Sequence, residues 1–223
     1  MKVHSLLSPA QDLFLKLFSQ NNSLSRDFYL TGGTALVEYY IPYRYSEDLD
    51  FFSEDEFKIE SLLVFIRSNK SHLKYTSFDF NTSFNRNIIF IKSYQSILKI
   101  EFTYYPFPPI VKPKRKHGIL VDSSLDIAVN KLFTIYQMPR SRDFMDLYMI
   151  QKKFHYSTDF LASKAKAKFE WHVDPLKLGS QFLLALELKD YPKLIKPLNE
   201  NAWQNHFKKE AKKLEKEVFI SKK

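Results

Sequence analysis

The stretch Tyr29-Leu-Thr-Gly-Gly-Thr-Ala-Leu36, followed after a short spacer by Tyr45-Ser-Glu-Asp-Leu-Asp-Phe-Phe52, decides the fold that this sequence predicts. Its first half predicts a strand, a turn at Gly32 and Gly33, and a helix that opens at Thr34, because glycine supplies the backbone freedom of a sharp turn. Backbone N–H groups at such a helix start form a binding place for phosphate. We therefore expect a phosphate site at this turn.

The second half of the stretch carries two acids, Asp48 and Asp50, in a run that continues into apolar residues. On a strand, residues two apart point to one face, which would place the two carboxylates about 6–7 Å apart. Such a pair suits hard divalent cations. Gly-Gly or Asp-x-Asp alone is common in other settings, but the combination at this spacing is more specific. A phosphate site beside an acid pair is typical of phosphoryl or nucleotidyl transfer.

Two further residues near this stretch are candidates for the same chemistry. Arg44 lies just before the acids, where its guanidinium can hold a phosphate or pair with Asp48. Glu101 is out of phase with the apolar residues Ile100 and Phe102 on a predicted strand, so it would face the other way. We interpret Glu101 as a third carboxylate, acting as a general base or a shared metal ligand.

The rest of the chain changes character at a proline-rich segment. Alternation of polar and apolar residues predicts strands at 74–80, 86–93 and 97–105. Residues 106–118 contain four prolines and a basic cluster, and we interpret them as a linker. Helical periodicity follows at 123–138, 142–153, 158–170, 174–189 and 200–220. The sequence therefore predicts an α+β protein with a catalytic domain at 1–110 and a helical domain with a basic surface at 111–223.

Charge and composition limit the function classes. Residues 1–110 hold 11 Lys and Arg against 12 Asp and Glu, a net −1, whereas residues 111–223 hold 23 against 13, a net +10. A basic half favours a polyanionic partner, nucleic acid before membrane, although a merely solvated lysine surface would look the same. The absence of cysteine excludes disulfides and thiol catalysis and fits a reducing cytoplasm. No apolar run is long enough for a membrane span, so we expect a cytoplasmic protein.

Two features of the helical half carry candidate chemistry. Lys131 shares a helix stripe with Ile127 and Ile135, which is unusual for a solvated lysine and suggests a cleft wall where its ammonium reaches a triphosphate. Asp143 and Asp146 lie three apart on the next predicted helix. An acid in a first turn complements the helix dipole, and Asp146 can also pair with Arg142 at i,i+4, so a structural role for both acids stays open.

Several ordered motifs together resemble the AbiEii/AbiGii-type nucleotidyltransferase toxins of bacteria, within the DNA polymerase β-like nucleotidyltransferase superfamily. They are Leu30-Thr-Gly-Gly-Thr-Ala-Leu36, Arg44 to Phe52, Lys99-Ile-Glu-Phe102, Lys131, and Arg142-Asp-Phe-Met-Asp-Leu-Tyr148. The resemblance implies a mixed β-sheet with flanking helices, a following helical domain, and an active site between them. It also implies transfer of a nucleotide from an NTP, with Mg²⁺, or Mn²⁺ in its place.

The resemblance also implies roles for particular residues and partners. Gly32, Gly33, Thr34 and Arg44 would hold the nucleotide, Lys131 would hold its phosphates, and Asp146 would be a second essential acid. Asp48 and Asp50, with Glu101 less firmly, would hold the metals. The implied acceptor is RNA, the 3′ end of tRNA in some members, and the implied protein partner is a cognate antitoxin of a toxin–antitoxin or abortive-infection system.

Two other functions compete with this one. The same fold could be a catalytically idle module that binds a nucleotide or RNA, although adjacent like charges at Asp48 and Asp50 have no use without a metal. A metal-dependent phosphatase or nuclease could use the same acids, although no histidine lies near Asp48 in the sequence.

Overall fold

The computed structural model describes residues 5–220. The chain forms two units, Met1–Ser123 and Ser124–Lys223; the first contains a sheet with helices, and the described elements of the second are helices. The strands are β1 Tyr29–Thr31, β2 Asp48–Ser53, β3 Ser77–Ser83, β4 Arg86–Lys92, β5 Ile97–Tyr104, β6 Lys114–Lys116 and β7 Ile119–Val121. The helices of the first unit are α1 Pro9–Gln20, α2 Leu24–Asp27, α3 Gly32–Tyr39, α4 Ile59–Ser68 and α5 Lys70–Leu73. The predicted fold class, a mixed α and β protein with a helical C-terminal part, is confirmed.

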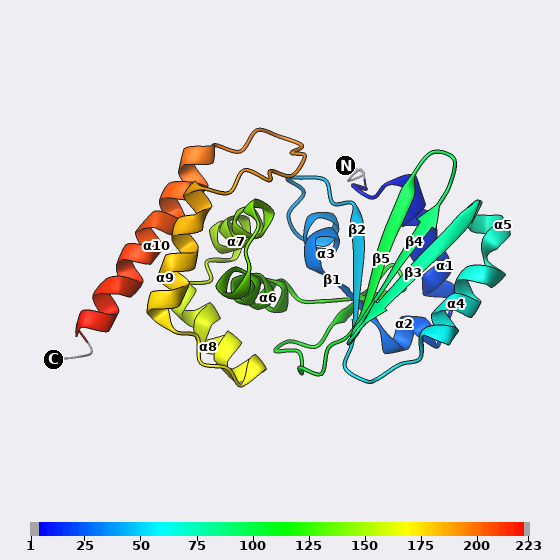
Figure 1. Ribbon diagram of the computed structural model, residues 1–223, viewed down its shortest axis with the longest axis horizontal. Helices are drawn as coiled ribbons and strands as arrows, with labels where there is room; N and C mark the ends of the chain where they lie inside the picture. Colours follow the sequence, from blue (N-terminus) through cyan, green and yellow to red (C-terminus); the bar gives the residue numbers. More distant parts are fainter. Residues whose placement is uncertain (1–4, 221–223) are drawn as a thin grey trace. The chain divides into compact units, whose positions relative to one another are not determined.

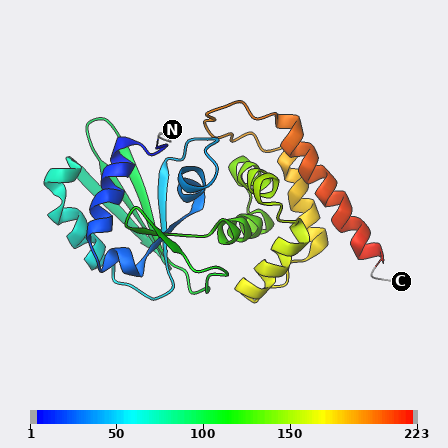
Figure 2. The same ribbon diagram turned by 180° about the vertical axis from the view of Figure 1, so that it is seen from behind.

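The strands of the first unit form one mixed seven-stranded sheet in the order β3-β4-β5-β2-β1-β7-β6. The pairs β2 with β5 and β1 with β7 are parallel, and the remaining neighbours are antiparallel. Helices α1, α2, α4 and α5 lie together on one face of this sheet, as Figures 1 and 2 show from opposite sides. The central strands β2 and β5 are therefore next to each other although about fifty residues separate them in the sequence.

The interpretation of residues 106–118 as a linker is wrong for the second part of this segment, because that part joins the sheet. Lys114–Lys116 and Ile119–Val121 form the hairpin β6–β7, and β7 pairs in parallel with β1. Only His117 and Gly118 connect the two strands, and both have positive φ, 47° and 82°. A two-residue loop with positive φ at both positions matches the right-handed twist of a hairpin. In the structure the first compact unit ends at Ser123 and the second begins at Ser124. The division into a catalytic domain at 1–110 and a helical domain at 111–223 stays a prediction.

The helix after β1 also begins earlier than expected. Helix α3 starts at Gly32, directly after β1, so no separate glycine turn precedes it and Thr34 lies inside the first turn. Gly32 makes this abrupt change of direction with φ +69°, in the left-handed region that favours glycine. Strand β1 begins only at Tyr29, because Leu24–Asp27 form the short helix α2.

Aromatic side chains fill the core between α1 and the sheet. Phe14 and Phe18, one helical turn apart on α1, are fully buried, and the Phe18 ring centroid lies 4.7 Å from that of Phe51 on β2. Phe51 in turn stacks on Phe102 of β5 at 5.0 Å. Burying one Phe side chain contributes about 1.5–3 kcal/mol. This cluster packs one face of β2 and β5 against α1. The residues on the other face of these two strands take no part in this core.

The second unit consists of helices alone within the part of the chain that the structure describes. Its elements are α6 Ser124–Gln137, α7 Ser141–Phe154, α8 Thr158–Phe169, α9 Pro175–Leu183, the 3-10 turn η1 Leu184–Leu186 and α10 Glu200–Ile220. The predicted helices match these elements within a few residues. Phe144 of α7 and Phe182 of α9 both pack on Phe207 of α10, with ring centroids 5.0 and 5.1 Å away. The helical periodicity of the sequence thus identifies the buried faces.

Candidate active site

The two predicted acids lie on one face of β2, as the alternation of the sequence required. Asp48 and Asp50 are half-buried, whereas Leu49 and Phe51 between and after them are fully buried in the core. The helices that cover Phe51 therefore lie on the face opposite to the carboxylates. This side of β2 keeps the acids accessible while the other side fixes the strand.

The start of α3 lies directly against the acid strand. A Cβ atom at Gly32 would lie 2.4 Å from Asp50 Oδ2, so only glycine allows this approach. A Cβ atom at Gly33 would lie 2.5 Å from a guanidinium nitrogen of Arg44. The Thr34 hydroxyl donates to the carbonyl oxygen of Asp48. The glycine motif and the acid motif, separate in the sequence, therefore form one local structure.

Arg44 and Thr34 are both used inside the first unit. Arg44 is buried, donates from Nη1 to the carbonyl oxygen of Tyr45 at 2.8 Å and from Nε to the Tyr43 hydroxyl at 3.2 Å. Thr34 is fully buried, so its side chain supports the acid strand and only its backbone remains for a phosphate. The role of both residues in nucleotide binding stays a prediction.

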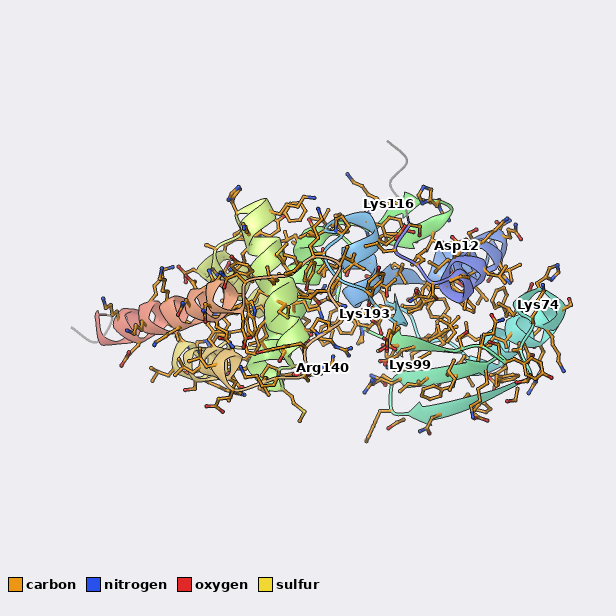
Figure 3. The ribbon with its side chains drawn as sticks, turned by 90° about the horizontal axis from the view of Figure 1, so that it is seen from above. Asp12, Lys74, Lys99, Lys116, Arg140 and Lys193 are labelled. Atoms are coloured by element: carbon orange, nitrogen blue, oxygen red, sulfur yellow. The ribbon has the colours of Figure 1, made fainter. Side chains whose placement is uncertain are left out.

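Sequence reasoning missed the cation that faces Asp48. Lys99 on β5 is the strand partner of Asp48, and its ammonium lies 3.0 Å from Asp48 Oδ2 (Lys99 is labelled in Figure 3). Lys99 precedes Glu101 by two residues and so shares its face of the strand. The alternation along the strand thus indicated which face Lys99 occupies. Only the pairing of β5 with β2 brings its ammonium to Asp48.

Glu101 lies beside Asp50, because the two are partners in the parallel pair of β2 and β5. Both Glu101 oxygens accept hydrogen bonds at 2.7 Å from Arg86 on β4, and Oε1 also accepts from the Thr103 hydroxyl at 3.0 Å. Burial by itself raises the pKa of Glu101, but the Arg86 hydrogen bonds and charge outweigh it and leave the pKa below its ordinary value. Glu101 is therefore ionised at neutral pH.

The carboxylates have the chemistry of a site for hard divalent cations. Asp48, Asp50 and Glu101 supply oxygen ligands from one face of two adjacent strands, the ligand type that Mg²⁺ prefers. Among residues 5–220, no three His, Cys, Asp or Glu side chains are gathered as a metal would require. Lys99 and Arg86 pair with Asp48 and Glu101 instead. The assignment of these three acids as metal ligands stays a prediction.

In the helical unit, Lys131 contacts both predicted acids of α7. Its ammonium lies 2.7 Å from Asp143 Oδ1 and 2.8 Å from Asp146 Oδ2, and both aspartates are fully buried. Asp143 also accepts from the backbone N–H of Arg140 at 3.2 Å and so caps α7, as the dipole interpretation anticipated. The Lys131 contact with Asp146 was not anticipated, because it joins two helices.

The charge of Lys131 changes the protonation of its partner. Burial by itself raises the pKa of the Asp143 carboxyl, but the Lys131 charge and hydrogen bond outweigh it, so the pKa lies below its ordinary value. The triad of Lys131, Asp143 and Asp146 therefore joins α6 to α7 as a buried ionic cluster. Its role toward a triphosphate stays a prediction.

Two solved structures share the fold of this chain. A structure described as "putative nucleotidyltransferase from H. pylori" has a TM-score of 0.58 at 20% identity and covers 96% of this chain and 98% of its own. JHP933 from Helicobacter pylori has the same TM-score and identity and covers 98% and 97%. At this identity the likeness shows the fold alone.

The sequence comparisons identify the family. Residues 16–219 match the family described as "Nucleotidyl transferase AbiEii toxin, Type IV TA system", and the chain belongs to this family. An uncharacterized protein of Aquifex aeolicus is 30% identical over 149 residues, which are 66% of this chain and 68% of that protein. The family inferred from the sequence motifs is confirmed.

Proposed function

We propose that this member of the AbiEii toxin family transfers a nucleoside monophosphate from an NTP to an RNA 3′ end, that of tRNA, with Mg²⁺ as cofactor. One observation carries the proposal: Gly32 at the start of α3 lies against the Asp50 carboxylate, with Glu101 as the neighbour of Asp50 across the strands. A helix start that binds phosphate and acids that bind cations thus belong to one surface. Transfer of a nucleotide needs both.

The chemistry assigns a separate task to each group. The 3′ hydroxyl of the acceptor loses its proton to solvent water, its oxygen forms a bond to the α-phosphorus, the bond from the α-phosphorus to the bridging oxygen breaks, and pyrophosphate leaves with the electron pair. The backbone at Gly32 and Gly33 would hold the phosphates, with Arg44 behind Gly33. Asp48, Asp50 and Glu101 would hold Mg²⁺, which when bound neutralises charge that develops on the phosphoryl oxygens.

The environment of Glu101 favours one of its two predicted roles. A general base works best when its pKa lies near the working pH. The Arg86 hydrogen bonds hold the pKa of Glu101 below the ordinary carboxyl value, which makes it a weak base and a permanent negative charge. We therefore propose Glu101 as a metal ligand rather than as the base.

The proposed partners follow from the family and from the charge of the second half. A cognate antitoxin would neutralise the enzyme, as expected for a toxin of a toxin–antitoxin system. The net charge of +10 on residues 111–223 favours an RNA acceptor. A reducing cytoplasm is the proposed location. None of the helices in the described part of the chain has the length and apolar character needed to cross a bilayer.

One observation favours the second candidate, an idle nucleotide-binding or RNA-binding module. Lys99 and Arg86 neutralise Asp48 and Glu101 without a metal, so repulsion between the acids is a weaker argument for catalysis than the sequence suggested. Both candidates share the fold, and only a measurement of transfer separates them.

The decisive experiment incubates the purified protein with total bacterial tRNA, Mg²⁺ and each of the four α-³²P-labelled NTPs separately. Asp48→Asn and Asp50→Asn should lower the rate at least about a hundredfold, because each removes a charge that the transition state needs. Asp79→Asn is the matched control, since Asp79 is an exposed acid of β3 in the same sheet, paired with Lys92. Label on RNA with the wild type and Asp79→Asn, but not with Asp48→Asn or Asp50→Asn, supports the proposal. Equal label with all four proteins contradicts the assignment of the site. No label with any NTP supports the idle module.

A further inference from the structure

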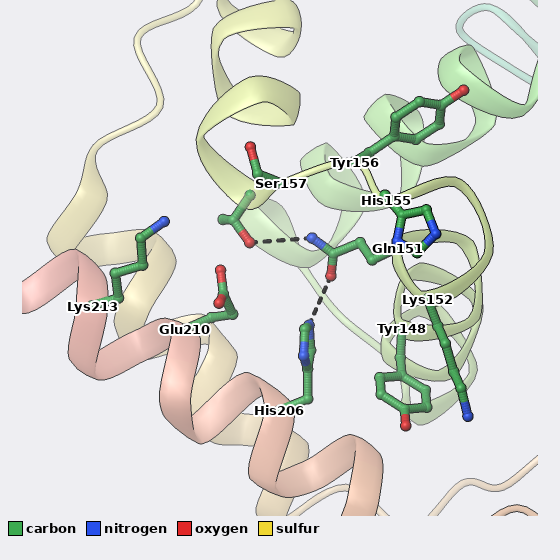
Figure 4. Close-up of a pocket in the computed structure, with 10 residues that line it drawn as sticks. Tyr148, Gln151, Lys152, His155, Tyr156, Ser157, His206, Glu210 and Lys213 are labelled. Atoms are coloured by element: carbon green, nitrogen blue, oxygen red, sulfur yellow. Dashed lines mark hydrogen bonds between the residues drawn. The ribbon is translucent and has the colours of Figure 1, made fainter.

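The helical unit contains a cavity outside the acid site. It has a volume of about 450 Å³ and lies where the end of α7, the start of α8 and the middle of α10 meet (Figure 4). Sites for small organic ligands usually have volumes of about 300–1,000 Å³. The cavity is therefore large enough for one nucleotide.

Hydrogen bonds fix the floor of this cavity. The side-chain amide of Gln151 donates to the Thr158 hydroxyl at 3.2 Å, and its oxygen lies 2.9 Å from His206 Nε2. An amide oxygen only accepts, so Nε2 carries the proton and donates. Burial lowers the pKa of His206, which keeps the ring neutral at neutral pH and leaves Nδ1 as an acceptor. The floor is thus uncharged and offers hydrogen bonds, as the edge of a nucleobase requires.

Aromatic rings form the walls. Tyr148 stands on α7 with its ring centroid 5.3 Å from that of His206, and Tyr156 stacks on Phe154 at 5.7 Å. Both tyrosines line the cavity and both are partly exposed. Rings fixed in this way are platforms on which an unpaired base can stack, since every base has a π-face.

The rim carries positive charge. Lys152 and Lys213 line the cavity; Lys152 lies over the Tyr148 ring at 6.0 Å, and the Lys213 ammonium pairs with Asp159 at 2.7 Å, so Lys152 supplies most of this charge. Helix α10 carries further exposed lysines, of which Lys209 and Lys216 lie within about a quarter turn of the face that lines the cavity. Glu210 is a carboxylate on the same rim, and it would direct a phosphate toward the lysines and accept a hydrogen bond from a base amino group. The charge therefore surrounds a neutral, aromatic centre.

We propose that this cavity binds one unpaired nucleotide of an RNA strand, with the base on the Gln151–His206 floor and beside Tyr148, and with the flanking phosphates on Lys152 and α10. The inference rests on the proposed function in that the RNA is the acceptor of the transfer. It adds a second anchor for the acceptor, carried by the helical unit alone. A free mononucleotide has the same chemistry, so the test separates it from a nucleotide within a strand.

The test measures binding of a fluorescein-labelled single-stranded RNA to the full chain by anisotropy. Tyr148→Leu should weaken binding about tenfold or more, because it removes a stacking platform. Trp171→Leu is the matched control, since Trp171 is a 57% exposed aromatic of the same unit outside the cavity, and it should change binding less than about twofold. Lys152→Gln, an exposed position, serves as a second variant against Lys166→Gln, with melting temperatures as the check of folding.

Cross-linking locates the contact directly. RNA carrying 4-thiouridine should cross-link under near-ultraviolet light within residues 148–158, and an AMP excess should not compete with it if the nucleotide must belong to a strand. Full competition by AMP identifies a free nucleotide as the ligand and overturns the proposal that the nucleotide belongs to an RNA strand. Cross-links found only elsewhere, with equal binding by Tyr148→Leu and Trp171→Leu, overturn the inference. Loss of antitoxin binding alone in Tyr148→Leu also overturns it, in favour of a protein partner.

The two proposals fail separately. Asp48→Asn should bind and cross-link RNA like the wild type. Cross-links at 148–158 without transfer by the wild type contradict the proposed function and leave the RNA site intact. Transfer that is unchanged in Tyr148→Leu and Lys152→Gln, with no cross-link in the cavity, contradicts the RNA site only.

Discussion

Acids of the sheet and acids of the helical unit are both paired with cations, but they lie in different surroundings. The side chains of Asp48 and Lys99 are 25% and 32% exposed, whereas Asp143 and Asp146 are 0% exposed and Lys131 is 12% exposed. Water screens the first pair, so it can open at little cost. The buried triad has no water to replace a lost partner, so its opening is expensive. The accessible ion pair of Asp48 and Lys99 suits a site that exchanges ligands. The buried triad suits a structural contact between α6 and α7.

The largest effect is expected from Lys131→Met. The substitution leaves Asp143 and Asp146 buried without their cation, and breaking a buried pair of this kind costs about 3–5 kcal/mol. Urea unfolding of the variant measures the loss. Asp143→Asn combined with Lys131→Met should recover part of the stability. A variant as stable as the wild type would refute the contrast between the two regions and would favour the predicted role of Lys131 as a phosphate ligand.

A smaller effect, about 1–3 kcal/mol, is expected from Gly32→Ala. The residue has φ +69°, and its new Cβ would meet the Asp50 carboxylate, so the start of α3 must move away from β2. Gly179→Ala is the control, because Gly179 lies within α9 and its Cβ would meet nothing closer than 3.5 Å. Alanine in a helix gains about 0.5–1 kcal/mol over glycine, so the control should change stability in the opposite direction. Equal shifts in thermal unfolding would contradict the close approach.

Acid should weaken the buried triad by part of the amount that Lys131→Met removes. The pKa of Asp143 is lower in the folded protein than its ordinary value, so its contribution is complete above that ordinary value and disappears as the pH falls through the folded pKa. Unfolding measured from about pH 6 down to about pH 3 should show this decline in the wild type and less of it in Asp143→Asn. Identical slopes would show that Asp143 does not contribute.

The smallest effect is expected from Lys99→Met, about 0–1 kcal/mol, because Lys99 and Asp48 form a partly exposed pair that water screens. The same urea experiment as for Lys131→Met makes the comparison direct. A loss of stability as large as that of Lys131→Met would mean that the Lys99–Asp48 pair stabilises the fold. It would contradict the interpretation of this pair as part of an accessible site.

Much of the site followed from the sequence because its motifs are local. Alternation along 48–52 predicted that Asp48 and Asp50 share a face, and two glycines before them predicted the tight entry into α3. The proposed joint action of these acids and Lys131 on one substrate stays a prediction. The contacts of Lys99 and Arg86 with Asp48 and Glu101 were not predicted, since they depend on which strands pair in the sheet.

The sequence by itself determined the longer strands and helices, the faces that they bury, and the family, because periodicity and turn chemistry depend on residues close together in the chain. Tertiary structure alone decided the place of β7 beside β1, the Lys99 and Arg86 contacts, and the use of Lys131 as a buried partner of two aspartates. Each of these contacts joins separate strands or helices. Strand order and burial, which no short stretch of sequence specifies, choose such partners.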